Sequence, residues 1–232
     1  YHDLNADGDQ DTGEPFLQSW QFYQENGSDE VRNATTDGAL QSTDVNGETT
    51  FTLKPGAAYT ICEVLQTNWI NSDPTGTTIC ETTPTLVSGT AAADRIFGNY
   101  QNVTVSGLKW HDRIGDGVRD ADGVDAVLGG TGAADDEVLL ANWEIHFFGT
   151  AGSGSGIHQH ALTNSSGAYS FTVTPGSYTI CETQQTGWAQ TYPIAATTGS
   201  ADCTALAHAA GDGGAGAASG RGWAVTLVSG TT

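Results

Sequence analysis

The chain has 232 residues, which is enough for one large domain or two domains of ordinary size. Its 27 acidic residues against 7 basic ones give a formal net charge of −20, which disfavours nucleic acid as a partner and favours multivalent cations. The 31 glycines and the low share of charged residues, 15%, are typical of secreted β-proteins, so we expect an extracellular or cell-surface location. The sequence contains no run of about 18 apolar residues, and we expect no membrane insertion.

An acidic loop comes first in chain order. Oxygen-bearing side chains stand at positions 1, 3, 5, 7, 9 and 12 of a loop with Gly8 at position 6, which is the spacing of a Ca²⁺ loop; they are Asp3, Asn5, Asp7, Asp9, Asp11 and Glu14. The glycine permits a sharp bend, and the last glutamate can close the ligand shell with both of its oxygens. Such hard oxygen ligands select Ca²⁺ over softer metals. A solvated acidic turn is the alternative interpretation, but six matching positions together with the glycine rarely coincide by chance. The absence of flanking helical patterns argues against an EF-hand protein.

Short runs of β-branched and aromatic residues follow, separated by Asn-Gly, Ser-Gly and Pro-Gly turns; examples are residues 19–23, 49–53, 143–148 and 169–173. In one run Trp143, Ile145 and Phe147 alternate with more polar residues, as in a strand that buries one face. The pattern predicts an all-β protein built as a sandwich.

The sequence also repeats itself, because Tyr1-His2-Asp3 matches Trp110-His111-Asp112 and the motif Tyr-Thr-Ile-Cys-Glu occurs at residues 59–63 and 178–182. Further matches join residues 43–56 to residues 163–176. We therefore predict two tandem immunoglobulin-like β-sandwich domains, residues 1–101 and residues 102–232, with an insertion in the second near residues 121–136.

The second repeat keeps part of the acidic loop. Positions 1, 5 and 9 retain aspartates and position 6 retains a glycine; these residues are Asp112, Asp116, Asp120 and Gly117. Ile114 removes the ligand at position 3. Aligning the two repeats beyond the insertion makes Glu137 the counterpart of Glu14 and the candidate closing ligand. We expect a second, weaker Ca²⁺ site here.

Each repeat carries two cysteines. Cys62 and Cys181 occupy the same repeat position, and each is followed by one more cysteine, Cys80 or Cys203. Four cysteines allow three connectivities, but only Cys62–Cys80 with Cys181–Cys203 respects the repeat, so we predict these two disulfides. A zinc site is disfavoured because the Cys-x-x-Cys spacing is absent.

Three other features carry weaker signals. Glycosylation sequons occur at Asn26, Asn33, Asn102 and Asn164, but chance occurrences are common in Ser/Thr-rich chains, so glycans stay an open expectation. His158 and His160 would share one strand face and could bind a transition metal, yet no third ligand is evident, which favours a surface pair. No nucleophile elbow or acid pair in a pocket-forming pattern is present, so we do not expect an enzyme.

The stretch from His2 to Pro15, the Pro-Gly-x-Tyr-Thr-Ile motif and Phe97-Gly98-Asn99 resemble the B-type repeat of serine-aspartate-repeat surface adhesins. The resemblance implies prealbumin-like β-sandwiches that bind Ca²⁺ in the Asp-rich loop and stack as rigid stalks. Related collagen-adhesin B-type domains form Lys–Asn cross-links assisted by an acidic residue; the residues that invite this comparison are Lys109, Asn99, Glu63 and Glu182.

Together these features predict a structural subunit of an extracellular filament, stalk or sheath, rigidified by Ca²⁺ and joined head to tail to copies of itself. Residues 225–232 resemble the segment that precedes Trp110, and Ser229-Gly230 placed ahead of Tyr1 imitates Ser106-Gly107. We expect this tail to add to the next copy as a β-strand, although a segment cut from a longer tandem polyprotein would carry the same pattern. A ligand-binding surface adhesin module, or accessory repeats of a larger secreted enzyme, remain alternatives.

Overall fold

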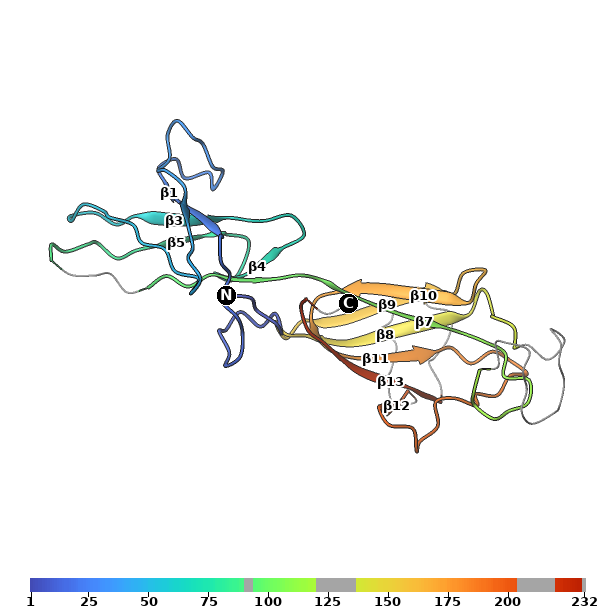
Figure 1. Ribbon diagram of the computed structural model, residues 1–232. Coiled ribbons are helices and arrows are strands. Elements are labelled where there is room, and N and C mark those ends of the chain that lie inside the picture. The colour runs from blue at the N-terminus through green and yellow to red at the C-terminus, as the bar shows by residue number, and fades with distance from the viewer. Residues whose placement is uncertain (90–93, 120–136, 204–219, 231–232) are drawn as a thin grey trace. The chain divides into compact units, whose positions relative to one another are not determined.

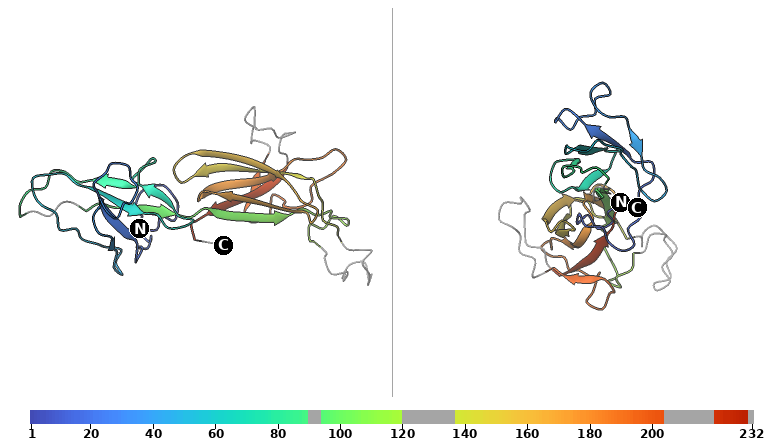
Figure 2. Two further views of the ribbon diagram at one scale, coloured as in Figure 1. Left: turned by 90° about the horizontal axis from the view of Figure 1, so that it is seen from above. Right: turned by 90° about the vertical axis from the view of Figure 1, so that its left-hand side faces the viewer.

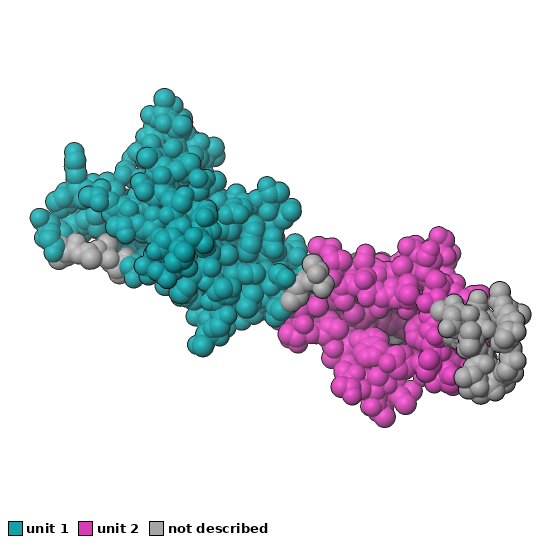
Figure 3. Space-filling view, viewed as in Figure 1, with its two compact units in different colours: residues 1–103, 152–154, 228–232 teal, residues 104–151, 155–227 magenta. Residues whose placement is uncertain are grey.

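The computed structural model describes residues 1–89, 94–119, 137–203 and 220–230. Within these ranges the regular elements are all β-strands joined by turns and loops (Figures 1 and 2), so the all-β prediction is confirmed. None of these ranges contains a helix long and apolar enough to cross a bilayer. The chain divides into two compact units (Figure 3): unit 1 comprises Tyr1–Val103, Gly152–Gly154 and Val228–Thr232, and unit 2 comprises Thr104–Ala151 and Ser155–Leu227.

The described residues of unit 1 form six strands: β1 (Gln21–Glu25), β2 (Gln41–Ser42), β3 (Thr60–Val64), β4 (Ile70–Asp73), β5 (Cys80–Thr82) and β6 (Gly98–Tyr100). One antiparallel sheet has the order β2-β1-β3-β5, and β4 pairs with β6 in a second, two-stranded sheet. The buried core consists of Trp20, Phe22, Ile61 and Phe97.

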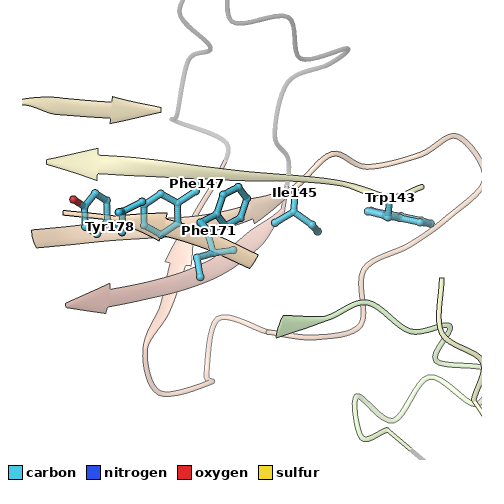
Figure 4. Close-up of a cluster of buried hydrophobic side chains, with 7 residues drawn as sticks. Trp143, Ile145, Phe147, Phe171 and Tyr178 are labelled. Carbon is cyan, nitrogen blue, oxygen red and sulfur yellow. The ribbon is translucent and has the colours of Figure 1, made fainter. Parts of the chain in front are cut away.

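Unit 2 has longer strands: β7 (Val103–Leu108, starting at the boundary), β8 (Glu144–Ala151), β9 (Gly156–Leu162), β10 (Ala168–Val173), β11 (Gly176–Glu182), β12 (Ser200–Asp202) and β13 (Arg221–Leu227). A five-stranded sheet has the order β12-β13-β11-β8-β9, and β10 pairs with β7. The core draws side chains from both sheets, as in a sandwich. In Figure 4 the side chains of Ile145 and Phe147 lie on one side of β8, together with those of Phe171 and Tyr178, and Trp143 lies at the end of the row beyond Ile145.

The same local structure precedes β1 in unit 1 and β8 in unit 2. In unit 1 the hydroxyl of Thr43 accepts a hydrogen bond from the Trp20 amide at 2.9 Å and donates one to the Leu17 carbonyl at 2.6 Å. In unit 2 the same two bonds, with the same lengths, join Thr163 to Trp143 and Leu140. The repeat seen in the sequence is therefore also a repeat of this hydrogen-bond pattern.

Both predicted disulfides are confirmed, but they sit differently in their sheets. Cys62 and Cys80 are directly opposite each other on the neighbouring strands β3 and β5. The bond between Cys181 and Cys203 instead passes over β13, which lies between β11 and β12. At the crossing the chain has Gly222, where an added Cβ atom would lie 2.6 Å from the Cys203 sulfur and 3.0 Å from the Cys181 sulfur. Only glycine leaves room for this disulfide.

One expected strand does not form. Residues 169–173 lie in β10, which pairs with β7, whereas their counterparts at residues 49–53 have no strand assignment. In the described part of the chain no backbone hydrogen bond joins residues 49–53 to another segment. A strand forms only where a neighbouring strand supplies partners for its backbone N–H and C=O groups, and β7 supplies them for β10. Phe171 and Val173 are accordingly buried, at 4% and 3% exposure, while Phe51 and Leu53 are only partly buried.

Candidate functional site

The acidic loop of unit 1 is organised around a buried aspartate. Asp3 is fully buried, and its Oδ1 accepts a hydrogen bond from the Ala6 amide at 2.6 Å. Its Oδ2 accepts one from the amide of Gly8 at 2.9 Å. Gly8 has a φ of +88°, in the region that favours glycine, so the chain can turn its amide back toward Asp3. Position 1 of the predicted motif thus fixes the bend at position 6.

Glu14 closes the same loop from its other end. Its Oε1 accepts a hydrogen bond from the Leu4 amide at 2.7 Å, and its Oε2 accepts one from the Asp11 amide at 3.1 Å. The side-chain amide of Asn5 donates to the carboxylates of Asp7, at 2.8 Å, and Asp11, at 3.1 Å. The predicted ligands are therefore gathered on one turn. Their side chains do not surround a common point, because no group of three or more His, Cys, Asp or Glu side chains in the described ranges is arranged to hold a metal ion.

The loop of unit 2 reproduces these contacts where its sequence is retained. The Asp112 carboxylate accepts hydrogen bonds from the amides of Gly115, at 2.5 Å, and Gly117, at 2.8 Å. Asp116 Oδ1 accepts one from the Val118 amide at 2.8 Å, as Asp7 Oδ1 does from the Asp9 amide at 2.9 Å. Asp120 lies outside the described residues. The two loops share a backbone scaffold even though Ile114 has replaced one ligand.

Glu137 occupies the place of Glu14. It is 3% exposed, and its Oε1 accepts a hydrogen bond from the Arg113 amide at 2.8 Å, just as Glu14 accepts from the amide after Asp3. The sequence alignment across the insertion thus has a counterpart in the hydrogen bonding. Whether Glu137 or any other residue of the two loops binds Ca²⁺ stays a prediction.

Asp112 is held in its ionised form. Burial acts to raise its pKa, but hydrogen bonds from the Thr191 side chain and from the amides of Gly117 and Gly115 outweigh burial and leave the pKa below its ordinary value. An ionised carboxylate at position 1 is one requirement of a Ca²⁺ site.

Two further carboxyls are buried at equivalent positions of the units. Glu63 accepts hydrogen bonds from the Trp20 indole at 2.9 Å, Asn99 at 2.8 Å and Asn71 at 2.9 Å. Burial raises the pKa of Glu63 despite these donors. Its counterpart Glu182 instead forms an ion pair with Lys109; the Nζ–Oε2 distance is 2.6 Å.

The residues named for a Lys–Asn cross-link lie in different units. Asn99 lies in unit 1 beside Glu63, whereas Lys109 lies in unit 2 beside Glu182. The lysine and the asparagine of the comparison are thus divided between the two units.

A third histidine, which the sequence pattern did not indicate, lies beside the histidine pair of β9. His160 is directly opposite His146 of β8 in the strand register, and Phe148 is opposite His158. Glu144 lies on the same strand face, two residues before His146. His158 is half-buried and His160 is exposed, as expected of a surface pair, and no group of three His, Cys, Asp or Glu side chains among the described residues is arranged to hold a metal ion. What the sequence did not indicate is the position of His146 beside this pair. The strand alternation from Glu144 to Phe148 could have revealed it, but the pairing of β8 with β9 was needed to bring the residues together.

The tail predicted to act as a donor strand begins inside unit 2. Residues 225–227 belong to β13 and pair with β11. Ser229 belongs to unit 1, where its amide donates to the Leu4 carbonyl at 2.8 Å and its hydroxyl accepts from the Gln101 amide at 2.7 Å. His2 Nε2 also lies 2.7 Å from this hydroxyl. A donor strand that includes residues 225–227 must first leave β13.

The four sequon asparagines, Asn26, Asn33, Asn102 and Asn164, are all exposed. Glycosylation at these positions stays a prediction.

No protein-family model and no curated protein matches the chain. Similar solved structures include the Bacillus anthracis TIE protein, at 14% identity over 94% of this chain and 30% of that chain, with a TM-score of 0.32. Another is GBS52, the minor pilin of Streptococcus agalactiae, at 15% identity over 98% and 83% of the two chains, with a TM-score of 0.28. The shaft pilin SpaA of Lactobacillus rhamnosus GG is 13% identical over 80% and 86%, with a TM-score of 0.27.

This chain spans 30% of the TIE protein and 53% of a streptococcal ancillary pilin to which it is also similar. At these identities and TM-scores the likeness carries no argument about function. Membership of the B-type repeat family stays a prediction.

Proposed function

We propose that the chain is a non-enzymatic structural subunit of an extracellular filament, stalk or sheath that joins copies of itself head to tail. The observation that carries the proposal is that residues 49–53 pair with no strand among the described residues, whereas their counterpart in unit 2, β10, pairs with β7. An open strand position is a site for β-strand addition, and repeated addition between identical copies gives an open filament. The two disulfides agree with an oxidising, extracellular location.

The sequence of the tail supports a second copy as the source of that strand. In unit 2 the hydroxyl of Thr104 on β7 lies 3.0 Å from that of Thr172 on β10, which fixes how the two strands match. By the Ser-Gly alignment Val228 corresponds to Val105, a residue that packs against the core of unit 2. An added strand would cover Phe51 and Leu53, which are now only partly buried.

Deletion of residues 228–232 tests the assembly step, because it removes the tail but leaves β13 whole. We expect a folded monomer by circular dichroism and no filaments by electron microscopy, whereas the full chain polymerises. A peptide with the sequence of residues 226–232 should block assembly, and a scrambled peptide should not. Polymerisation of the truncated chain would refute strand donation, and single particles of the full chain that capture a soluble ligand would favour the adhesin module.

Ca²⁺ is proposed to rigidify both loops, mainly the loop from Asp3 to Glu14. Five carboxylates in that loop repel one another, and a bound divalent cation would remove this repulsion. At a free Ca²⁺ concentration 100 times the dissociation constant, binding stabilises the folded state by about 2.7 kcal/mol. For a unit of this size that corresponds to a rise in melting temperature of roughly 10–20 °C.

Calorimetry with Ca²⁺ and with chelator tests the metal assignment. Asp7→Ala should abolish most of the Ca²⁺-dependent rise, and Asp94→Ala, an exposed aspartate outside the loop, should leave it intact. Superimposable melts of the unmodified chain in the two conditions would exclude the Ca²⁺ assignment without affecting the assembly proposal.

A further inference from the structure

Unit 2 carries a cluster of three histidines on the sheet face opposite its core. Along β8 the residues Ile145 and Phe147 point into the core, so His146 between them points to the other face. The imidazole ring centroids of His158 and His160 lie 5.6 Å and 6.0 Å from that of His146. Three imidazoles thus gather where two neighbouring strands pair.

The hydrogen bonds around His146 define which of its nitrogens carries the proton. The hydroxyl of Thr183 donates its one hydrogen to Glu144 Oε2 at 3.2 Å. The 2.8 Å contact between Thr183 Oγ1 and His146 Nε2 therefore needs the N–H on the histidine side. In the neutral ring this leaves a lone pair on Nδ1, a tautomer assigned here from the hydrogen-bond network.

That lone pair faces a second imidazole nitrogen. His146 Nδ1 lies 3.4 Å from Nε2 of His158. In a tetrahedral zinc site with Zn–N bonds of about 2.0–2.1 Å, two ligand nitrogens are separated by about 3.3–3.4 Å. The spacing of the two rings therefore suits a shared metal ion as well as a shared proton.

We propose that this face binds a divalent transition metal of the zinc class, with His146 Nδ1 and His158 Nε2 as the first two ligands and His160 as the third. His160 now lies with Nδ1 3.3 Å from Glu144 Oε1, and its side chain is 35% exposed, so on metal binding it can leave this contact and rotate toward the ion. This rotation is required, because no three candidate ligands of the described residues already surround one point. A solvent molecule would complete the tetrahedron.

Glu144 and Thr183 act as positioning residues. The Glu144 carboxylate holds the Thr183 hydroxyl, and this hydroxyl contacts Nε2 of His146 and so orients its imidazole. In known metal sites the ring nitrogen that does not bind the metal is usually held by such a hydrogen bond. Glu144 is 13% exposed and His160 lies at the open side of the cluster, so an ion can enter there although His146 is fully buried. Imidazole ligands select zinc, copper or nickel over Ca²⁺, which separates this site from the acidic loops.

The test is isothermal titration of the full, chelator-treated chain with Zn²⁺ in buffer that already contains saturating Ca²⁺, which occupies the acidic loops. We expect one Zn²⁺ per chain. His158→Gln should lower the affinity at least 100-fold, His160→Gln should also weaken binding, and Glu144→Gln should lower the affinity by 10- to 100-fold. Gln159→Ala, an exposed residue on the other face of β9, should bind as the unmodified chain does.

A Co²⁺ titration adds a readout that folding alone would not move, because a tetrahedral nitrogen site gives an intense visible absorption. His158→Gln should lose this absorption while its circular dichroism stays unchanged. Absence of Zn²⁺ binding in the unmodified chain, or binding that survives His158→Gln and His160→Gln, would overturn the proposal.

Discussion

Replacing Lys109 by methionine should destabilise unit 2 by stranding a buried carboxylate. The Lys109 Nζ and Glu182 Oε2 atoms are 2.6 Å apart, and the two side chains are only 18% and 9% exposed. At an effective dielectric constant of about 20 the attraction at this distance is about 6 kcal/mol, most of which is offset by the desolvation of both charges. The ammonium also lies 4.5 Å from the Trp143 ring centroid, a contact worth about 0.5–1 kcal/mol.

Loss of one partner from a buried pair costs about 3–5 kcal/mol. We expect the lower end, about 3 kcal/mol, for Lys109→Met, since the methionine keeps most of the apolar stem. The double variant Lys109→Met with Glu182→Gln should recover to within about 1 kcal/mol of the unmodified chain, because no charge is then left buried. The free energies of unfolding of the single and double variants can be measured by urea unfolding, monitored through hydrogen exchange in peptides from unit 2. A single variant that costs under about 1 kcal/mol, or a double variant as unstable as the single one, would refute this reasoning.

Two more outcomes follow from buried positions. Burial raises the pKa of Glu63 in the folded state, so as pH rises the unfolded chain loses this proton before the folded chain does. The contribution of Glu63 to stability is therefore full below its ordinary pKa and is lost as pH rises through the folded-state pKa. Unfolding measured from pH 4 to 8 should show this loss of stability, and Glu63→Gln should abolish this part of the pH dependence. Gly222→Ala should destabilise unit 2 by about 1–3 kcal/mol in thermal unfolding, since its Cβ would meet the Ile180 carbonyl and both disulfide sulfurs, whereas Gly156→Ala, with open space around it, should be nearly neutral.

The features that the sequence predicted well are those fixed by short spacings or by the repeat. The bend at Gly8 follows from the loop motif, and the pairing of Cys181 with Cys203 follows from the symmetry of the halves. Glu137 could be placed beside Asp112 across the insertion for the same reason. Repetition supplies the long-range information that a single motif lacks.

The features that the sequence did not reveal depend on strand pairing. Residues 49–53 have the composition of a strand, but a strand forms only where a partner supplies hydrogen bonds. Likewise His146 is distant in sequence from His158 and His160, and only the register of β8 against β9 brings the three together. Neither fact is encoded in a local pattern.

The disulfides also limit how far the chain can lengthen under mechanical tension. A pull on the two ends of a fully unfolded unit cannot extend the segment between its bonded cysteines, which are 18 residues apart in unit 1 and 22 apart in unit 2. At about 3.4 Å per extended residue, some 60 Å of contour length stays hidden in the first unit and some 75 Å in the second. A fibre built from such units would yield in short steps under oxidising conditions and in longer ones after reduction.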